Sequence, residues 1–382
     1  MKQELKDFVD FIQKTYQTTN FIPLHEPCFD DRERSLVLDC IDSTFVSSVG
    51  MYVEKFEEEL ARYMGAKYAI ATMNGTSALH VALLLAGVAR NTEVITQSLS
   101  FIATCNAISY CGASPTFVDV DKQTLGLSAQ SLKEFLTEHA EIIGQQCFNK
   151  RTNRRISACV PMHTFGHPCE ISKIKIICEE WNIPLVEDAA ESLGSTFQNQ
   201  HAGTFGVMGA ISFNGNKIIT GGGGGAIITN DQDLARRAKH LTTTAKLPHK
   251  WAFNHDQIAY NYRMPNLNAA LLFAQLGKID SFISNKRDTA SLFQIWCEQN
   301  NIAFIVEPKD ASSNYWLNAI LLNNYSEQQA FLQYANEKGV MSRPVWTLLN
   351  TLPMFKDSFS SPLCNSYWLA ERLVNIPSSV RQ

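Results

Sequence analysis

Short apolar runs alternate with amphipathic stretches along most of the chain. Runs rich in β-branched residues predict strands, and stretches with apolar residues at helical spacing predict the helices between them. The expected order is strand 67–72, helix 77–88, strand 92–97, helix 101–112, strand 114–121, and then strand, helix, strand over 155–190. Because these strands are apolar without alternation, we expect a mostly parallel sheet that helices cover on both faces, which is an α/β fold.

The two ends of the chain carry patterns of their own. Residues 1–20 predict an amphipathic N-terminal helix and do not have the pattern of a signal peptide, so we expect a cytoplasmic protein. From about residue 281, further helical and strand runs predict a smaller C-terminal α/β domain, 281–382, which leaves 21–280 as the large domain. A chain of 382 residues is long enough for both.

Composition and charge argue against several classes of function. The formal net charge is -4, so the chain lacks the basic excess that favours binding to nucleic acid or to an anionic membrane. The longest apolar run, 78–88, is shorter than the roughly 20 residues of a membrane-spanning helix. Ten cysteines occur without a C-x-x-C pair, and Gly166 between His163 and His167 indicates a loop. We therefore expect no nucleic acid, no membrane, no disulfide and no metal site.

The first of the predicted strands ends in a polar tetrapeptide. In parallel sheets, ligands bind beyond the carboxyl ends of the strands. Asn74-Gly75-Thr76-Ser77 suits a turn followed by a helix N-cap. It also suits a phosphate group, because a helix N-terminus offers free amides and the two hydroxyls add donors. The dinucleotide fingerprint G-x-G-x-x-G is absent from this turn, which disfavours a nicotinamide enzyme.

Two other strand ends have an ordinary and a chemical explanation. Glu187 and Asp188 follow an apolar strand, where acids are commonly solvated or capping. If Asp188 is buried, it needs a cationic partner, for which a protonated pyridine nitrogen is suitable. Phe101 begins a predicted helix and is either a core side chain or a ring that stacks on a planar ligand.

Lys217 lies between two apolar runs, and a tract of five glycines, 221–225, follows it closely. Such a tract is often a flexible linker. Between two strands, glycine more plausibly allows a close backbone approach or a positive φ. A lysine on such a loop can form a Schiff base with an aldehyde. Together with an acid for a pyridine nitrogen, a stacking ring and a phosphate-binding helix start, it makes up the parts of a pyridoxal phosphate site.

The motifs that surround these residues carry a family resemblance over nearly the whole chain. They are STFVSSVGMYVEKFEEELARYMGAKYAIATMNGTSALHVAL, VPMHTFGHP, VEDAAESLGS, SFNGNK with its glycines, and YNYRMPNLNAALLFAQL. In this order they resemble the DegT-type sugar aminotransferases, which are fold-type I pyridoxal phosphate enzymes. The resemblance implies a seven-stranded, mostly parallel sheet in the large domain. FIPLHEP, KHLTTTAKLPH, SNYWLNAI and NIPSSV are most similar to the enzymes of legionaminic acid biosynthesis.

The resemblance implies a role for individual residues. Lys217 is expected to form the Schiff base and to move the proton, and Asp188 to keep the pyridine nitrogen protonated. The other cofactor contacts that it implies are Phe101 on the ring, Gly75, Thr76, Ser77 and Ser212 at the phosphate, Glu191 near the ring oxygen, and Asn261 at the phosphate of a neighbouring subunit. Glu191 stands where many relatives have glutamine, and a carboxylate cannot donate a hydrogen bond.

The resemblance also implies a homodimer with shared active sites. Arg263 is the alternative to Asn261 for the contact between subunits. The candidate substrate contacts are Ser48 in FVSSVG, Lys246 in TTTAKLPHKW, His163 and Arg263. The expected reaction moves an amino group from glutamate to a 4-keto-6-deoxy nucleotide sugar.

The residues also allow three alternatives to this reaction. A 3-keto sugar aminotransferase has the same cofactor site. A sugar dehydratase has histidine in place of the lysine, so Lys217 disfavours it. A non-catalytic regulator that keeps the cofactor predicts loss of catalytic groups, which are all present. The nucleotide, the substituent at C2 and the stereochemistry at C4 cannot be read from the sequence.

Overall fold

Seven strands form one continuous sheet in the computed structural model of the protein, which describes residues 2–381. Their order is β3-β2-β6-β7-β10-β11-β1, where isolated bridges between Cys159 and Leu185 and between Met162 and Asp188 join β6 to β7. Of these seven strands, β11 runs in the direction opposite to the other six. The bounds are β1 Tyr68–Thr72, β2 Glu93–Gln97, β3 Ser114–Val118, β6 Arg154–Val160, β7 Val186–Asp188, β10 Met208–Ser212 and β11 Gly225–Thr229. The expected mostly parallel sheet is confirmed.

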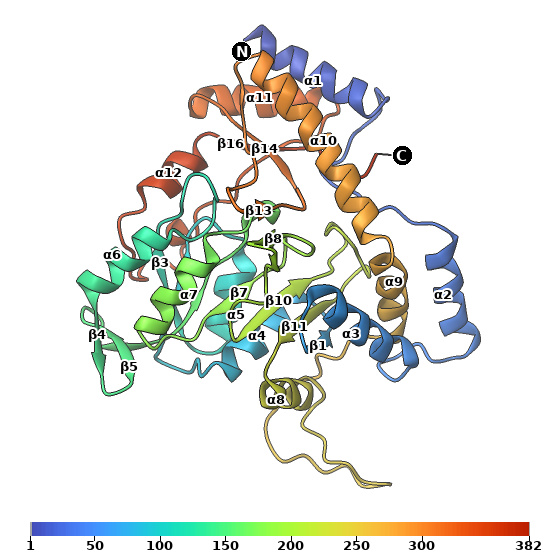
Figure 1. The fold of residues 1–382 in the computed structure, drawn as a ribbon, viewed down its shortest axis with the longest axis vertical. Helices are drawn as coiled ribbons and strands as arrows, with labels where there is room; N and C mark the ends of the chain where they lie inside the picture. The colour runs from blue at the N-terminus through green and yellow to red at the C-terminus, as the bar shows by residue number, and fades with distance from the viewer. Residues whose placement is uncertain (1, 382) are drawn as a thin grey trace.

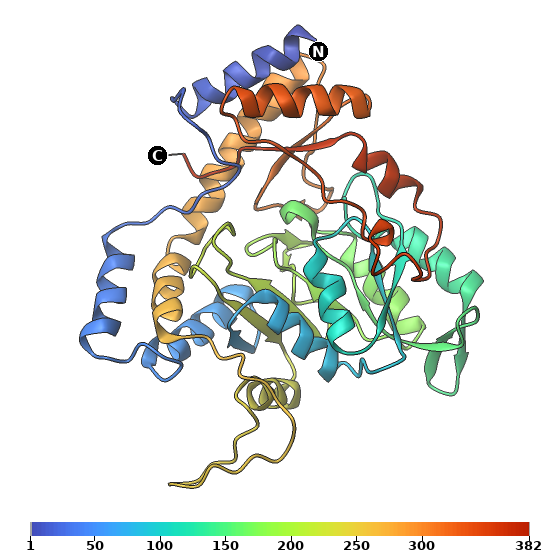
Figure 2. The ribbon, with the colours of Figure 1, turned by 180° about the vertical axis from the view of Figure 1, so that it is seen from behind.

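Helices cover both faces of this sheet (Figures 1 and 2). Alternate residues of β1 point to opposite sides: Ile70 packs in one apolar core, whereas Ala69 and Ala71 pack in another. The first core also contains residues of α4 Gly75–Leu85, α5 Ile102–Tyr110 and α8 Gln232–Thr242. The second contains residues of α3 Met51–Met64 and α9 Asn266–Leu276, and a third core is built around α6 Ala129–His139 and α7 Ile171–Glu180.

The start and the end of the chain share one further core. Four antiparallel strands lie in the order β12-β14-β16-β15, and α1 packs against α10 and α11 beside them (Figure 1). Leu5, Phe8, Val9 and Ile12 of α1 are buried there with Phe293 of α10. The bounds are α1 Gln3–Thr15, α10 Ile279–Gln299, α11 Tyr325–Glu337, β12 Ala303–Phe304, β14 Asn318–Leu321, β15 Arg343–Pro344 and β16 Leu373–Ile376. The division of the chain at residues 20 and 280 stays a prediction.

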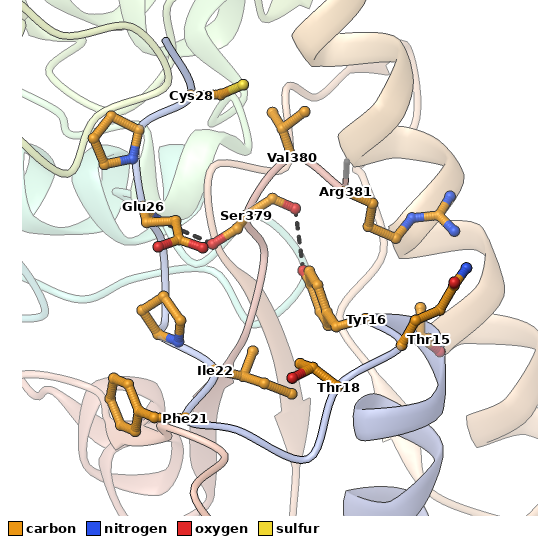
Figure 3. Close-up of a pocket in the computed structure, with 13 residues that line it drawn as sticks. Thr15, Tyr16, Thr18, Phe21, Ile22, Glu26, Cys28, Ser379, Val380 and Arg381 are labelled. Atoms are coloured by element: carbon orange, nitrogen blue, oxygen red, sulfur yellow. Dashed lines mark hydrogen bonds between the residues drawn. The ribbon is translucent and has the colours of Figure 1, made fainter.

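The segment after α1 is tied to the last residues of the chain (Figure 3). Tyr16 donates its hydroxyl hydrogen to the carbonyl of Ser379 at 3.1 Å, and the amide of Glu26 donates to Ser379 Oγ at 3.0 Å. These contacts border a cavity of about 280 Å³. The N-terminal segment is therefore held against the C-terminal tail both by its helix and by the segment that follows the helix.

Several elements were not expected from the sequence. Among them are α2 Asp31–Asp42, the hairpin of β4 Ala140–Ile143 and β5 Gln146–Asn149, the three-stranded sheet of β8 Thr196–Phe197, β9 Gln200–His201 and β13 Ala311–Ser312, the short helices η1 Thr164–Gly166 and η2 Leu349–Thr351, and α12 Cys364–Ala370. Within residues 2–381, no helix combines the length and the apolar character needed to cross a membrane.

We expect Phe8→Ala to destabilise the protein by about 3–5 kcal/mol, because it leaves a cavity in a packed core. The Phe8 ring is fully buried, stacks on Trp296 at 5.0 Å and meets Phe293 edge-on at 5.8 Å. Urea unfolding followed by circular dichroism measures the effect. Phe21→Ala is the matched control, since Phe21 is 65% exposed and its loss should leave the unfolding midpoint nearly unchanged. Equal shifts in the two variants would contradict the packing of α1.

Candidate active site

A cavity of about 400 Å³ lies at the carboxyl end of the parallel strands. The first turn of α4 borders it on one side, and the ends of β7 and β10 lie beneath it. Trp316, just before β14, and Trp346, just after β15, close it from the C-terminal part of the chain. Other lining residues are Asn74, Gly75, Thr76, Leu79, Phe101, Ala103, Met162, Asp188, Ala190, Glu191, Ser212, Asn214, Asn216 and Lys217.

The start of α4 has the chemistry of an anion site. Asn74 is the N-cap, and its side chain accepts a hydrogen bond from the amide of Ser77 at 2.8 Å. The amides of Gly75 and Thr76 come first in the helix and have no intrahelical acceptor. A Cβ on Gly75 would lie only 2.8 Å from Cβ of Ser212, so the absence of a side chain at Gly75 lets the two elements meet. Amides, hydroxyls and the positive end of the helix dipole suit a phosphate monoester here.

Asp188 ends β7 with its carboxylate buried at 6% exposure. Thr104 donates to its Oδ2 at 2.7 Å, and the amide of Ala190 donates to its Oδ1 at 3.2 Å. Burial raises the pKa of Asp188, although these donors and the nearby charge of Lys217 oppose the rise. A carboxyl that is costly to ionise here would be stabilised as a carboxylate by a cationic ligand group. Phe101 lines the same cavity with its ring half exposed.

Lys217 brings an amine into this cavity between an acid and an aromatic ring. Its Nζ lies 3.3 Å from Oε1 of Glu191 and 3.8 Å from the centre of the Trp316 ring. Glu191 is 3% exposed, and its Oε2 accepts a hydrogen bond from the amide of Phe165 at 2.9 Å. Burial raises the pKa of Glu191 to about 7, against the opposing effect of Lys217. The Glu191 carboxyl can therefore gain or lose a proton near neutral pH.

The glycine tract after Lys217 packs against protein backbone. A Cβ on Gly225 would lie 2.4 Å from the carbonyl carbon of Asn74, so only glycine lets β11 pass the start of α4. Gly222 and Gly224 have positive φ angles of 77° and 133°, which favour glycine. Both physical reasons expected for the tract are thus present. The close approach, however, joins β11 to the N-terminal end of α4 and does not involve the open cavity directly.

Some predicted site residues lie away from the cavity. His163 is fully buried, with Nε2 at 3.0 Å from Glu187 and Nδ1 accepting from the amide of Cys169 at 3.2 Å. Burial disfavours the charge on His163, but Cys169 and Glu187 raise its pKa above the usual value. The structure therefore holds this ring between Glu187 and Cys169, and His163 does not line the cavity. The Ser77 side chain is also largely buried, beneath the first turn of α4.

Four more predicted contacts are on the surface of the same chain. Lys246 lies over the ring of Phe253 at 4.0 Å, in a long arm of residues 243–263 that projects from the body (Figure 1). At the base of this arm, Nε of Arg263 donates to Oδ1 of Asn261 at 3.1 Å. Ser48 lies in the loop before α3. None of the four lines the cavity of its own chain.

Trp316 and Trp346 were not predicted as site residues. Trp316 was visible in the motif SNYWLNAI, but nothing local in the sequence relates it to a lysine 99 positions earlier. In the structure its indole Nε1 donates to the carbonyl of Asn216 at 2.7 Å, which fixes the ring beside Lys217. Trp346 packs against Phe165 and near Phe101.

Comparison with known proteins identifies the family of the chain. Residues 27–381 match the DegT/DnrJ/EryC1/StrS aminotransferase family. The chain belongs to this family. It is 36% identical to a GDP-perosamine synthase of Escherichia coli O157:H7, over 94% of this chain and 93% of that protein. It is 33% identical to a putative pyridoxal phosphate-dependent aminotransferase of Bacillus subtilis, over 87% of this chain and 84% of that protein.

A solved structure shows the same fold. The crystal structure of a DegT DnrJ EryC1 StrS aminotransferase from Brucella abortus matches with a TM-score of 0.81 and 25% identity, over 91% of this chain and 90% of that one. The DegT-family aminotransferases depend on pyridoxal phosphate, and the cavity fits this cofactor. It combines an amine for the aldehyde, a buried carboxyl for the ring nitrogen and a helix N-terminus for the phosphate.

We expect Gly75→Ala to weaken binding of pyridoxal phosphate by about tenfold or more, or ~1.4 kcal/mol, because the new methyl group meets Ser212 where the phosphate is expected to bind. Gly215→Ala is the matched control, since a Cβ there meets no atom within 4 Å. Titration of the cofactor-free protein, followed by fluorescence, measures both affinities. Unchanged affinity in Gly75→Ala would place the phosphate elsewhere.

Proposed function

We propose that this member of the family transfers the amino group of glutamate to C4 of a 4-keto-6-deoxy nucleotide sugar. The observation that carries the proposal is the convergence of Lys217, Asp188 and the α4 N-terminus on one cavity. Pyridoxal phosphate, when bound, supplies the electron-accepting ring and carries the amino group between the two substrates. Lys217 holds it by a covalent bond and moves a proton at the sugar carbon. Asp188 keeps the ring nitrogen protonated, and Phe101 and Trp316 form walls of the space for the ring.

The choice of C4 and of the nucleotide rests on the similarity of this chain to named relatives. The relative from Escherichia coli is named for GDP-perosamine, a 4-amino sugar nucleotide, so a GDP-linked 4-keto-6-deoxy sugar is the first substrate to test. The motif likeness to legionaminic acid enzymes makes other nucleotide-linked 4-keto sugars the second set. Nuclear magnetic resonance of the product distinguishes 4-amination from the 3-amination of the alternative.

We expect Lys217→Ala to abolish turnover of glutamate and keto sugar, because no other amine of the chain lines the cavity in residues 2–381. Coupled detection of 2-oxoglutarate measures the reaction, and Lys173→Ala, which changes an exposed lysine of α7, is the control. Turnover retained in Lys217→Ala would refute the proposal. A wild-type protein that binds the cofactor but is inactive would support the alternative of a non-catalytic regulator.

We also propose that two chains form a dimer and complete each other's sites. Large apolar side chains are exposed on the arm, with Trp251 at 77%, Phe253 at 76% and Ile258 at 91%. Phe45, Val49 and Met51 are exposed before and at the start of α3. An apolar surface of this kind favours a protein partner. Asn261 and Arg263, at the base of the arm, are exposed in their own chain and are therefore free to contact a cofactor in the second one.

Mixed dimers test the shared site. Lys217→Ala and a double variant, Asn261→Ala with Arg263→Ala, are expected to be nearly inactive alone. Co-expression with different affinity tags should restore roughly a quarter of wild-type activity, because half of the random dimers then hold one intact site. No restoration in purified mixed dimers would show that each chain uses its own arm. A monomer by light scattering would exclude the arrangement.

A further inference from the structure

Glu191 is the acid nearest to the reactive amine, and its protonation decides what it can do. Its Oε1 is 3.3 Å from Nζ of Lys217. In pyridoxal phosphate, the ring oxygen and the aldehyde group that the lysine bonds are attached to neighbouring ring carbons. A group within hydrogen-bond reach of Nζ is thus close to that oxygen as well. Carboxylate and phenolate oxygens are both acceptors, so a proton must lie between them if they are to attract each other.

The protein holds Glu191 in one orientation. Its Oε2 accepts from the amide of Phe165, a residue with a positive φ of 57°. Non-glycine residues adopt this conformation at a cost, which is often retained where it positions a functional group. The Glu191 carbonyl accepts from Nδ2 of Asn314 at 2.9 Å. With Oε2 and the backbone both fixed, Oε1 is the oxygen left to face the amine and the cavity.

The charges around Glu191 come from three directions. Lys217 faces it from the loop after β10, and Asp188 faces it from the end of β7. His25 lies near Lys217, and its neutral form is favoured by burial and by the neighbouring lysines. His163 lies behind Asp188. Burial raises the pKa of Glu191 to about 7, and Asp188 adds to the rise, whereas Lys217 and the amide of Phe165 oppose it.

We propose that Glu191 contacts the bound cofactor as a neutral carboxylic acid, with the hydrogen on Oε1 donated to the ring oxygen. Once Lys217 is bonded to the cofactor, its full ammonium charge no longer holds Glu191 as a carboxylate. Glu191 then takes one proton from solvent above neutral pH and keeps its Oε2 bond to Phe165. A glutamine would donate from its amide at every pH. Glu191 therefore makes cofactor binding depend on pH where a glutamine does not. This inference rests on the proposed role of Lys217.

Calorimetric titration of the cofactor-free wild type and of Glu191→Gln with pyridoxal phosphate tests the proposal. At pH 8, in buffers of different ionisation enthalpy, we expect the wild type to take up close to one proton more than Glu191→Gln. Its affinity relative to that variant should be constant below pH 7 and fall by up to tenfold per pH unit above it. The ionisations of the cofactor itself are common to both proteins and cancel. Glu179→Gln, an exposed change on α7, should behave as the wild type.

Equal proton uptake and parallel pH profiles would overturn the proposal. If Glu191→Gln does not fold, the infrared difference spectrum of the wild type at pH 8 decides: the cofactor should add the carbonyl band of a protonated carboxyl, and no such band would overturn it. A failure of the proposed role of Lys217 can be told apart from a failure of the Glu191 proposal. If Lys217 does not bond the cofactor, Lys217→Ala should bind it as tightly as the wild type and give the same visible absorption spectrum.

Discussion

The structure depends on holding two carboxyl groups out of water beside a single amine. Asp188 and Glu191 are both nearly inaccessible, and an isolated buried carboxylate is costly. Thr104 and the amide of Ala190 compensate the first, while Phe165 and Lys217 compensate the second. Each compensating group comes from a different segment around the seven-stranded sheet, so the sheet and its helices must pack correctly before the site exists. The site therefore forms only when the sheet and the segments around it are correctly folded.

The parts of the fold that were predictable are those with local causes. Continuous apolar runs defined strands such as β2 and β6, and the polar residues at their ends pointed to Asp188 and the start of α4. The hairpin β4–β5 escaped prediction because Ile142 and Ile143 are exposed on it, and exposed apolar residues do not produce a recognisable pattern. Its turn depends on Gly144, whose positive φ is a property of the folded chain.

The site could be predicted only for residues whose type alone indicates their chemistry. Lys217, Asp188, Thr76 and Phe101 line one cavity, as their residue types suggested. His163 does not, because the nearby acid Glu187 and the amide of Cys169 use both of its nitrogens. Trp316 and Asn314 act through contacts with residues 100 and 123 positions away, and no periodicity encodes such contacts.

The shared core of α1 and the C-terminal sheet has a consequence for synthesis on the ribosome. The apolar face of α1 is made long before its partners in α10, α11 and β16, which lie between Ile279 and Ile376. At typical elongation rates this delay is on the order of tens of seconds. Until those partners have been made, Leu5, Phe8 and Ile12 lack the native surface that covers them, so this apolar face stays open to other contacts in the nascent chain.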